Sequence, residues 1–185
     1  MNCNRKVWCA GTMNLVKRVA VGDREALEQL YLSYKTKVFR LALAILGDCF
    51  LAEDTVQETF LKIQQSAEGF HFRNSEGAWI MTIARNTAID ILRKRRREVV
   101  HEEIEELLDN VWPPANTIEL NENEGFLELI RKLNETDQQI VSLHLIGELK
   151  HHEIAHILDM NVAAVKKRYR RAIEKIAREM EEHHE

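Results

Sequence analysis

The chain has 185 residues, enough for one compact domain or two small ones. Hydrophobic residues make up 45% and charged residues 30%, which is ordinary for a folded soluble protein. Seven glycines and two prolines leave few turn signals, so the composition favours helices joined by short connections. No apolar run reaches the roughly 18–20 residues of a membrane span, and no signal-peptide pattern opens the chain. We therefore expect a cytoplasmic protein without direct membrane insertion.

The net charge of −4 alone argues against nucleic-acid binding, but the charges are unevenly distributed. Basic runs occupy 93–97 and 166–171, and the stretch from Glu98 to Glu128 between them is strongly acidic. This pattern suggests two DNA-contacting surfaces separated by a repelling linker, with solvated helix faces as the alternative. The odd count of cysteines, without paired spacing, argues against a disulfide framework.

The first elements read in chain order are a tail and a long helix. Residues 1–13 show no periodicity, so we expect a flexible tail there, or an alternative start at Met13. Asp23 is a good N-cap for a helix that ends at Gly47-Asp48. Its apolar positions follow helical spacing. They are Leu27, Leu30, Tyr31, Tyr34, Val38, Leu41 and Ile45.

A second helix, predicted over 51–65, has two faces of different character. One is an apolar stripe made of Ala52, Val56, Phe60 and Ile63. The other gathers Asp54, Gln57, Glu58 and Leu61. An acidic patch that contains an exposed leucine predicts a docking surface for another protein, and a plain solvent face is the alternative.

A third helix is predicted from about Ala78 into the basic run that ends at Arg97. Pro113-Pro114 then interrupts regular structure. The predicted fold is all-α, with two small helical domains joined by an acidic linker that lets them move independently until a partner fixes them. The expected parts are a tail over 1–13, a domain over 14–97, a linker over 98–118 and a domain over 119–185. The second domain should hold helices over 120–133, 136–146, 151–158 and 162–180.

The last two helices have the pattern of a helix-turn-helix. A short amphipathic helix over 153–158 is followed by a turn over 159–161, where Asn161 is a good N-cap for the second helix. The second helix exposes one small and four basic side chains. They are Ala163, Lys166, Lys167, Arg170 and Arg171. Such a face can approach a DNA groove and reach phosphates or base edges. A core helix that happens to be basic is the alternative.

Three blocks of the chain resemble the extracytoplasmic-function (ECF) class of RNA polymerase sigma factors, in the family's order and spacing. Residues 52–62 resemble its polymerase-docking helix. Residues 79–90, followed by 92–95, resemble its −10 recognition helix, and residues 153–168 resemble its −35 helix-turn-helix. The resemblance covers about residues 14–180.

The resemblance implies a promoter-recognition subunit with no catalytic activity, no cofactor and no metal, acting on a regulon for stress or envelope signals. Its implied partners are core RNA polymerase, promoter DNA and an anti-sigma factor. The implied polymerase contacts are Asp54, Gln57, Glu58 and Leu61. The loop 68–76 and one face of the third helix would handle the −10 element. The implied residues on that helix are Asn86, Asp90, Arg93 and Lys94. The −35 element would be read by Ala163, Lys166, Lys167, Arg170 and Arg171.

The chain also departs from the family's pattern. Lys150 stands where Ser or Thr often precedes the helix-turn-helix, Asp159 replaces a frequent glycine, and Met81 replaces an aromatic residue. We therefore interpret Trp79 as a core residue, and base stacking is the less favoured alternative. Residues 152–156 match the H-E-x-x-H zinc-peptidase motif, but no third ligand follows in a fixed pattern. A zinc peptidase and a stand-alone helix-turn-helix regulator are the alternative functions.

Overall fold

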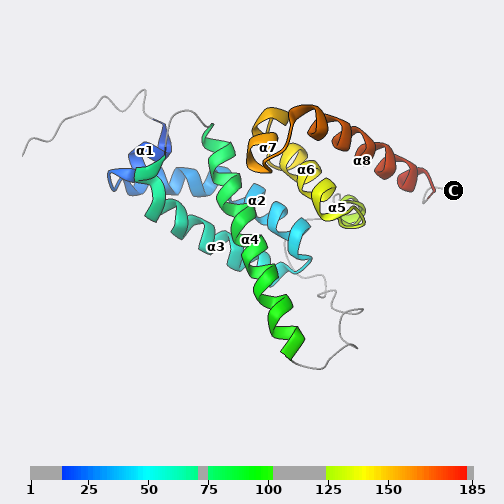
Figure 1. Ribbon diagram of the computed structural model, residues 1–185. Coiled ribbons are helices and arrows are strands. Elements are labelled where there is room, and N and C mark those ends of the chain that lie inside the picture. Colours follow the sequence, from blue (N-terminus) through cyan, green and yellow to red (C-terminus); the bar gives the residue numbers. More distant parts are fainter. Residues whose placement is uncertain (1–13, 71–74, 102–123, 183–185) are drawn as a thin grey trace, which may run out of the picture.

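The computed structural model describes residues 14–70, 75–101 and 124–182, and these residues form helices without any strand. Figure 1 shows the helices in chain order. They are α1 (Leu15–Ala20), α2 (Arg24–Leu46), α3 (Cys49–Ser66), α4 (Glu76–His101), α5 (Glu124–Arg131), α6 (Glu135–Leu145), α7 (His151–Ile157) and α8 (Val162–Glu182), with a 3-10 turn at Ala67–Gly69. We call α1–α4 the N-terminal unit and α5–α8 the C-terminal unit. The prediction of an all-α fold is confirmed.

The ends of the first long helices lie where the capping residues predicted them. The Asp23 carboxylate accepts a hydrogen bond from the Ala26 amide at 3.1 Å and begins α2. Gly47 ends the same helix with a left-handed φ of 68°, a conformation that glycine adopts without a Cβ clash. The Asp48 carboxylate then accepts from two amides at the start of α3. A tight turn thus reverses the chain and lays α3 against α2.

The predicted apolar stripe of α3 packs into the core of the N-terminal unit. Its members are buried, with exposed fractions of 8% or less, and they contact apolar residues of α2 and α4. They are Ala52, Val56, Phe60 and Ile63. Since this stripe faces the core, the opposite side of α3 faces solvent.

The short helix α1 was not predicted as a separate element. Val16 and Val19 are buried against the N-terminal unit, and the Asn14 side chain accepts from the Val16 amide at 2.9 Å. The carboxylate of Glu76, at the start of α4, also accepts hydrogen bonds from backbone amides of this first turn. Burial raises the pKa of the Glu76 carboxyl, and those amides oppose the shift. Helix α1 therefore packs on α2, α3 and the 3-10 turn, and the Glu76 carboxylate connects its first turn to the start of α4.

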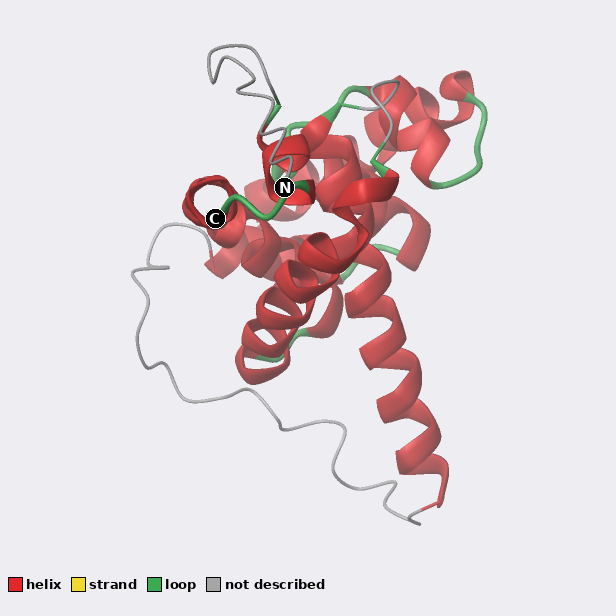
Figure 2. Ribbon diagram, turned by 90° about the vertical axis from the view of Figure 1, so that its left-hand side faces the viewer, coloured by secondary structure: helices red, strands yellow, loops and turns green. Residues whose placement is uncertain are grey.

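The two units pack against each other, which differs from the expectation that they move independently. Figure 1 shows the C-terminal unit beside the N-terminal half of α4, and Figure 2 shows the same helices turned by 90°. Helix α2 contacts α5 and α6, and α4 contacts α7. One continuous hydrophobic core joins the buried residues of the N-terminal unit to five buried positions of the C-terminal unit and to the α6–α7 loop. The core includes Ile140, Leu143, Leu149, Ile154, Ala155 and Val165. Apolar side chains of the facing helices are buried against one another across the boundary, and this burial favours docking.

The boundary of the linker also differs from the prediction. Helix α4 continues past Arg97 to His101, so the first residues of the expected linker are helical. The remaining part of the expected linker, over 102–118, and the expected tail over 1–13 lie outside the described residues. The division of the chain into domains therefore stays a prediction at those positions.

Candidate protein- and nucleic-acid-binding surfaces

The acidic face of α3 lines a groove between α3 and α4 with a volume of about 410 Å³. All four residues predicted for this face are exposed, and Leu61 exposes 54% of its surface. The groove is lined by Asp54, Gln57, Glu58, Leu61, Lys62, Thr87, Asp90, Ile91 and Lys94. An open, partly apolar groove rimmed by three carboxylates and two amines suits a partner surface that carries apolar and charged groups together.

Lys62 ties the two walls of this groove together. Its Nζ lies 3.4 Å from the Glu58 carboxylate on α3, one helical turn away. The same Nζ donates to the Thr87 hydroxyl on α4 at 3.2 Å. Because Glu58 and Lys62 are both substantially exposed, the pair contributes little to folding. Its effect is to fix the position of one groove carboxylate relative to α4.

The four residues predicted on α4 for the −10 element fall into two sets. Asp90 and Lys94 line the α3–α4 groove, together with the predicted polymerase contacts. Asn86 and Arg93 are exposed but do not line it. Two of the predicted −10 residues on α4 therefore line the same groove as the predicted polymerase contacts on α3.

Arg85 is a neighbour of this surface that sequence reasoning did not single out. Its Nη1 donates to the Asn86 side-chain oxygen at 2.9 Å, and its Nε donates to the Gln139 side chain of α6 at 2.8 Å. This contact engages the Asn86 side-chain oxygen and leaves its NH₂ group as the donor that the side chain can offer. The partners lie 54 positions apart, and no local pattern predicts such a contact.

The aromatic and sulfur side chains near the start of α4 belong to the core. Trp79 is half-buried and packs edge-on against Phe70, with ring centroids 5.2 Å apart. Met81 is fully buried. Both observations agree with the interpretation of Trp79 as a core residue. The expected −10 loop lies partly outside the described residues, over 71–74.

The helix-turn-helix is formed by α7 and α8. The connecting turn contains Asp159 with a left-handed φ of 51°, the conformation for which the family often uses glycine. Aspartate adopts this conformation more readily than most residues, so the turn forms although Asp159 departs from the family's pattern. Asn161 caps α8, because its side-chain oxygen accepts from the Ala163 amide at 2.8 Å.

Helix α7 begins after Lys150, and the Glu153 side chain caps its start. A lysine side chain cannot accept a hydrogen bond, but the Glu153 carboxylate accepts from the Lys150 amide at 2.8 Å. The Ser75 hydroxyl donates to the same carboxylate and also accepts from the Ala78 amide at the start of α4. Partial burial opposes ionisation of Glu153, yet these bonds hold its pKa below the usual range. One carboxylate thus links the N-termini of α4 and α7.

The recognition helix α8 is held in place from its inner side. Val165, Ala172 and Ile176 are buried, and Tyr169 packs against the rings of His144 and His151. Burial lowers the pKa of His151, and the nearby His144 and Lys166 lower it further.

An ion pair adds to this packing. The Arg168 guanidinium lies 2.8 Å from the Asp137 carboxylate of α6. Arg168 therefore orients α8 instead of pointing freely into solvent.

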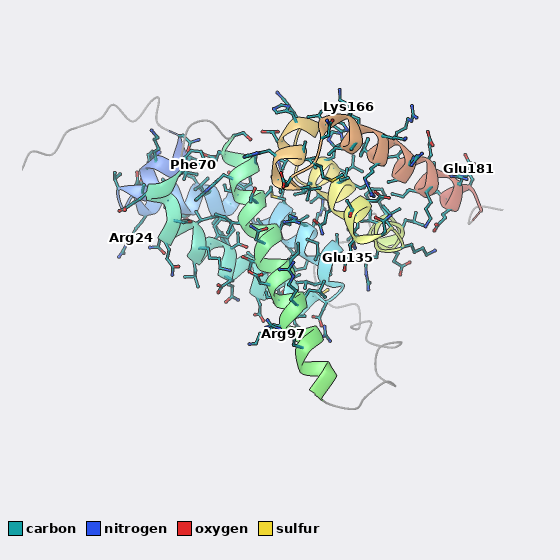
Figure 3. All side chains as sticks on the ribbon, viewed as in Figure 1. Arg24, Phe70, Arg97, Glu135, Lys166 and Glu181 are labelled. Carbon is teal, nitrogen blue, oxygen red and sulfur yellow. The ribbon has the colours of Figure 1, made fainter. Side chains whose placement is uncertain are left out.

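The predicted −35 residues all lie on the exposed side of α8. They are Ala163, Lys166, Lys167, Arg170 and Arg171. Figure 3 shows Lys166 pointing outward from the molecule, on a different side from Arg97 at the far part of α4. Arg170 lies 3.6 Å from Glu174, and both side chains are largely exposed, so the pair is weak. This face therefore offers cations for binding phosphates or base edges.

The H-E-x-x-H residues do not form a metal centre. His152 and His156 are exposed, while Glu153 is engaged by Ser75 and Lys150. Within the described residues, no group of three His, Cys, Asp or Glu side chains is placed to hold a metal ion.

Together, these surfaces define an all-helical protein with a groove bordered by acidic side chains and a basic helix-turn-helix. Residues 30–98 match the family described as sigma-70 region 2, and residues 124–176 match the family described as sigma-70, region 4. The chain belongs to the ECF class of RNA polymerase sigma factors, which direct promoter recognition. The resemblance in the three sequence blocks is thereby confirmed.

Named relatives and solved structures agree with this family. The chain is 31% identical to the ECF sigma factor BldN of Streptomyces coelicolor, over 91% of this chain and 66% of BldN. It is 28% identical to the ECF sigma factor SigW of Bacillus subtilis, over 89% of this chain and 94% of SigW.

The solved structure of CnrH in complex with the cytosolic domain of CnrY has a similar fold, with a TM-score of 0.66 at 20% identity. That match covers 90% of this chain and 95% of CnrH. A sigma factor RpoE, solved with the anti-sigma factor NepR from Bartonella quintana, also has a TM-score of 0.66, at 23% identity over 83% of this chain and 96% of RpoE. Among the helices that the structure describes, none combines the length and apolarity of a membrane span.

Proposed function

We propose that this sigma factor docks on core RNA polymerase through the α3–α4 groove, engages the −10 element through α4, and reads the −35 element through α8. The single observation that carries the proposal is the exposed face of α3. Asp54, Gln57, Glu58 and Leu61 lie opposite the buried stripe, where packing of this chain does not require them. Leu61, which is 54% exposed, adds an apolar group to this acidic face, and an apolar group bordered by polar ones suits a protein interface.

The charge distribution supports the separation of roles. The α3 side of the groove carries Asp54 and Glu58, which repel DNA phosphates and suit a basic protein partner. The exposed side of α8 carries cations and suits DNA. Two of the proposed −10 residues, Asp90 and Lys94, line the same groove as the α3 face, so in this proposal they lie next to bound polymerase.

The proposal includes a regulator and a cellular location. Two proteins of similar fold are described in complexes, CnrH with CnrY and RpoE with the anti-sigma factor NepR. By analogy, we propose an anti-sigma factor for this chain, action in the cytoplasm, and a role without catalysis or cofactor.

The test reverses charge on the α3 face. The variant Asp54→Lys with Glu58→Lys should bind core polymerase at least tenfold more weakly in a fluorescence titration, because it places like charges against a basic partner. Its helical content should not change, since both side chains are exposed. The matched control, Glu28→Lys with Glu53→Lys, changes the same charge at exposed positions outside the groove and should bind like the native chain. Unchanged affinity of the groove variant would contradict the proposal.

A further inference from the structure

A large exposed aromatic side chain lies at the start of α3, where the sequence predicted no binding residue. Helix α3 begins at Cys49, ahead of the predicted start at 51, so Phe50 belongs to its first turn. Phe50 is 73% exposed, and among the described residues the hydrophobic clusters of both units do not include it. A single exposed apolar residue is common on protein surfaces, so its position relative to other groups decides its meaning.

Phe50 lies on the same face of α3 as the proposed polymerase contacts. With 3.6 residues per turn, steps of four, seven and eleven residues return to one side of a helix. These steps lead from Phe50 to Asp54, Gln57 and Leu61, and all four residues are exposed. We call these four residues the α3 row, which is about 16 Å long at a rise of 1.5 Å per residue. The row has an apolar group at each end and polar groups between them.

The backbone of Phe50 is fixed before any partner binds. The Asp48 carboxylate accepts from the Phe50 amide at 2.9 Å and from the Leu51 amide at 3.1 Å. The same carboxylate lies 3.2 Å from the Arg95 guanidinium, so an ion pair ties the first turn of α3 to α4. Because the backbone is held and phenylalanine has only two side-chain torsions, ordering the ring in a complex costs little conformational entropy.

The charges beside Phe50 select the kind of partner. Asp54 follows Phe50 by one helical turn, and Glu58 follows by two. Their carboxylates repel DNA phosphates, which argues against a base-stacking role for the ring. A second copy of this chain, bound through the same face by a twofold axis, would bring two acidic faces together. A basic protein surface with an apolar pocket satisfies both the ring and the carboxylates, and the proposed function supplies such a partner in core polymerase.

We propose that Phe50 is an aromatic anchor of polymerase docking, and that the docking surface extends from the α3–α4 groove by one turn to the start of α3. Phe50 does not line that groove, and Asp54 is the lining residue of α3 nearest to it in sequence. Aromatic side chains that enter a partner's pocket carry a large share of the binding free energy at interfaces. The identity of the partner rests on the proposed function. The tests change Phe50 alone, so a failure of the anchor is distinguishable from a failure of the acidic face.

The first test asks what Phe50 touches in the assembled enzyme. Replacement of Phe50 by the photoreactive analogue p-benzoylphenylalanine keeps an aromatic ring at this position. Irradiation of the holoenzyme, with and without a promoter fragment, should cross-link the chain to a core polymerase subunit in both samples. The same analogue at Val21 is a control, because Val21 is 78% exposed and lies at the other end of α2, and it should give no such product. Absence of the polymerase cross-link from position 50, with or without one to DNA or to a second copy, would overturn the proposal.

The second test measures what the ring contributes to affinity. Phe50→Ala should weaken binding to core polymerase about thirtyfold, the usual loss when an aromatic anchor is truncated. The loss should appear as faster dissociation with an unchanged salt dependence, because the group removed is apolar. Phe50→Leu keeps an apolar side chain and should have an intermediate affinity. The helical content of both variants should equal that of the native chain, since the side chain is exposed.

Two comparisons separate an anchor from an indirect effect. The control Val21→Ala removes apolar surface at a comparably exposed position and should bind like the native chain. Reversal of the acidic face, Asp54→Lys with Glu58→Lys, should change the salt dependence of binding, whereas Phe50→Ala should not. If reversal weakens binding and Phe50→Ala leaves it unchanged, the acidic face stands and the anchor is refuted. Equal losses of affinity in Val21→Ala and Phe50→Ala would also overturn the proposal.

Discussion

The ion pair between Arg168 and Asp137 offers a direct test of what orients the recognition helix. Its atoms are 2.8 Å apart, and the side chains are 43% and 16% exposed. Exposed pairs contribute about 0.2–1 kcal/mol, and hydrogen bonds to charged groups about 1.5–3 kcal/mol. Because one partner is nearly buried and the other is not, we expect a coupling free energy of about 1 kcal/mol. For a chain of this size, that corresponds to about 2–4 °C in Tm.

The assay is a double-mutant cycle of urea unfolding with Arg168→Ala, Asp137→Ala and both changes together. Asp137→Ala alone should cost more than the coupling energy, because Asp137 also accepts from the Asn134 side chain at 2.6 Å, and the cycle cancels that loss. Arg168→Ala should weaken −35 binding without changing its salt dependence, since the guanidinium is used inside the protein. A coupling energy below about 0.3 kcal/mol would refute the reasoning, as would a salt slope reduced by one ion.

Three further predictions concern the helix-turn-helix that α7 and α8 form. Arg170→Ala should cost about 1–3 kcal/mol in binding of the −35 element by holoenzyme and relax the preference at one base. Lys167→Ala should weaken binding to all promoters alike and lower the salt slope by roughly one ion. The reverse pattern would exchange the roles of the two residues. Asp159→Gly should raise the free energy of unfolding by about 0.5–1 kcal/mol in urea titration, because glycine adopts the left-handed φ without strain, and a loss of stability would contradict this.

The third of these concerns pH. The pKa of His151 is lower in the native chain than in the unfolded one, so the unfolded chain binds the proton more readily and stability falls as pH drops below about 6.5. His151→Gln should reduce the pH dependence of the urea midpoint below about pH 6.5. An unchanged pH profile would contradict a contribution of the His151 ring to this dependence.

Helix positions followed from the sequence because their signals are local. Asp23, Gly47 and Asn161 cap helices through bonds that span only a few residues, and the apolar stripe of α3 follows a fixed period. Helix α1 was missed because it is only six residues long, too short for a periodic pattern. The departures at Lys150 and Asp159 were visible in the sequence, but their structural solutions were not.

The docking of the two units could not be predicted, because periodicity identifies an apolar face and not its partner. Leu143 and Leu149 belong to helical and loop patterns that a separate C-terminal domain would also show. The acidic segment between the units suggested an extended linker, yet α2 contacts α5 and α6, and α4 contacts α7. Likewise, the pairing of Arg85 with Gln139 depends on tertiary packing between residues 54 positions apart, for which a single sequence carries no local signal.

The position of Lys62 has a thermodynamic consequence for the α3–α4 groove. Its Nζ contacts both Glu58 and Thr87. A ligand that draws the Glu58 carboxylate away from Lys62 therefore also changes the hydrogen bond between Lys62 and Thr87 on α4. Linkage makes such an effect mutual. If polymerase bound to α3 changes the affinity of α4 for DNA by some factor, DNA bound to α4 changes the affinity of α3 for polymerase by the same factor. A single lysine thus connects the two proposed binding surfaces on adjacent helices, and the proposed function makes their two binding equilibria interdependent.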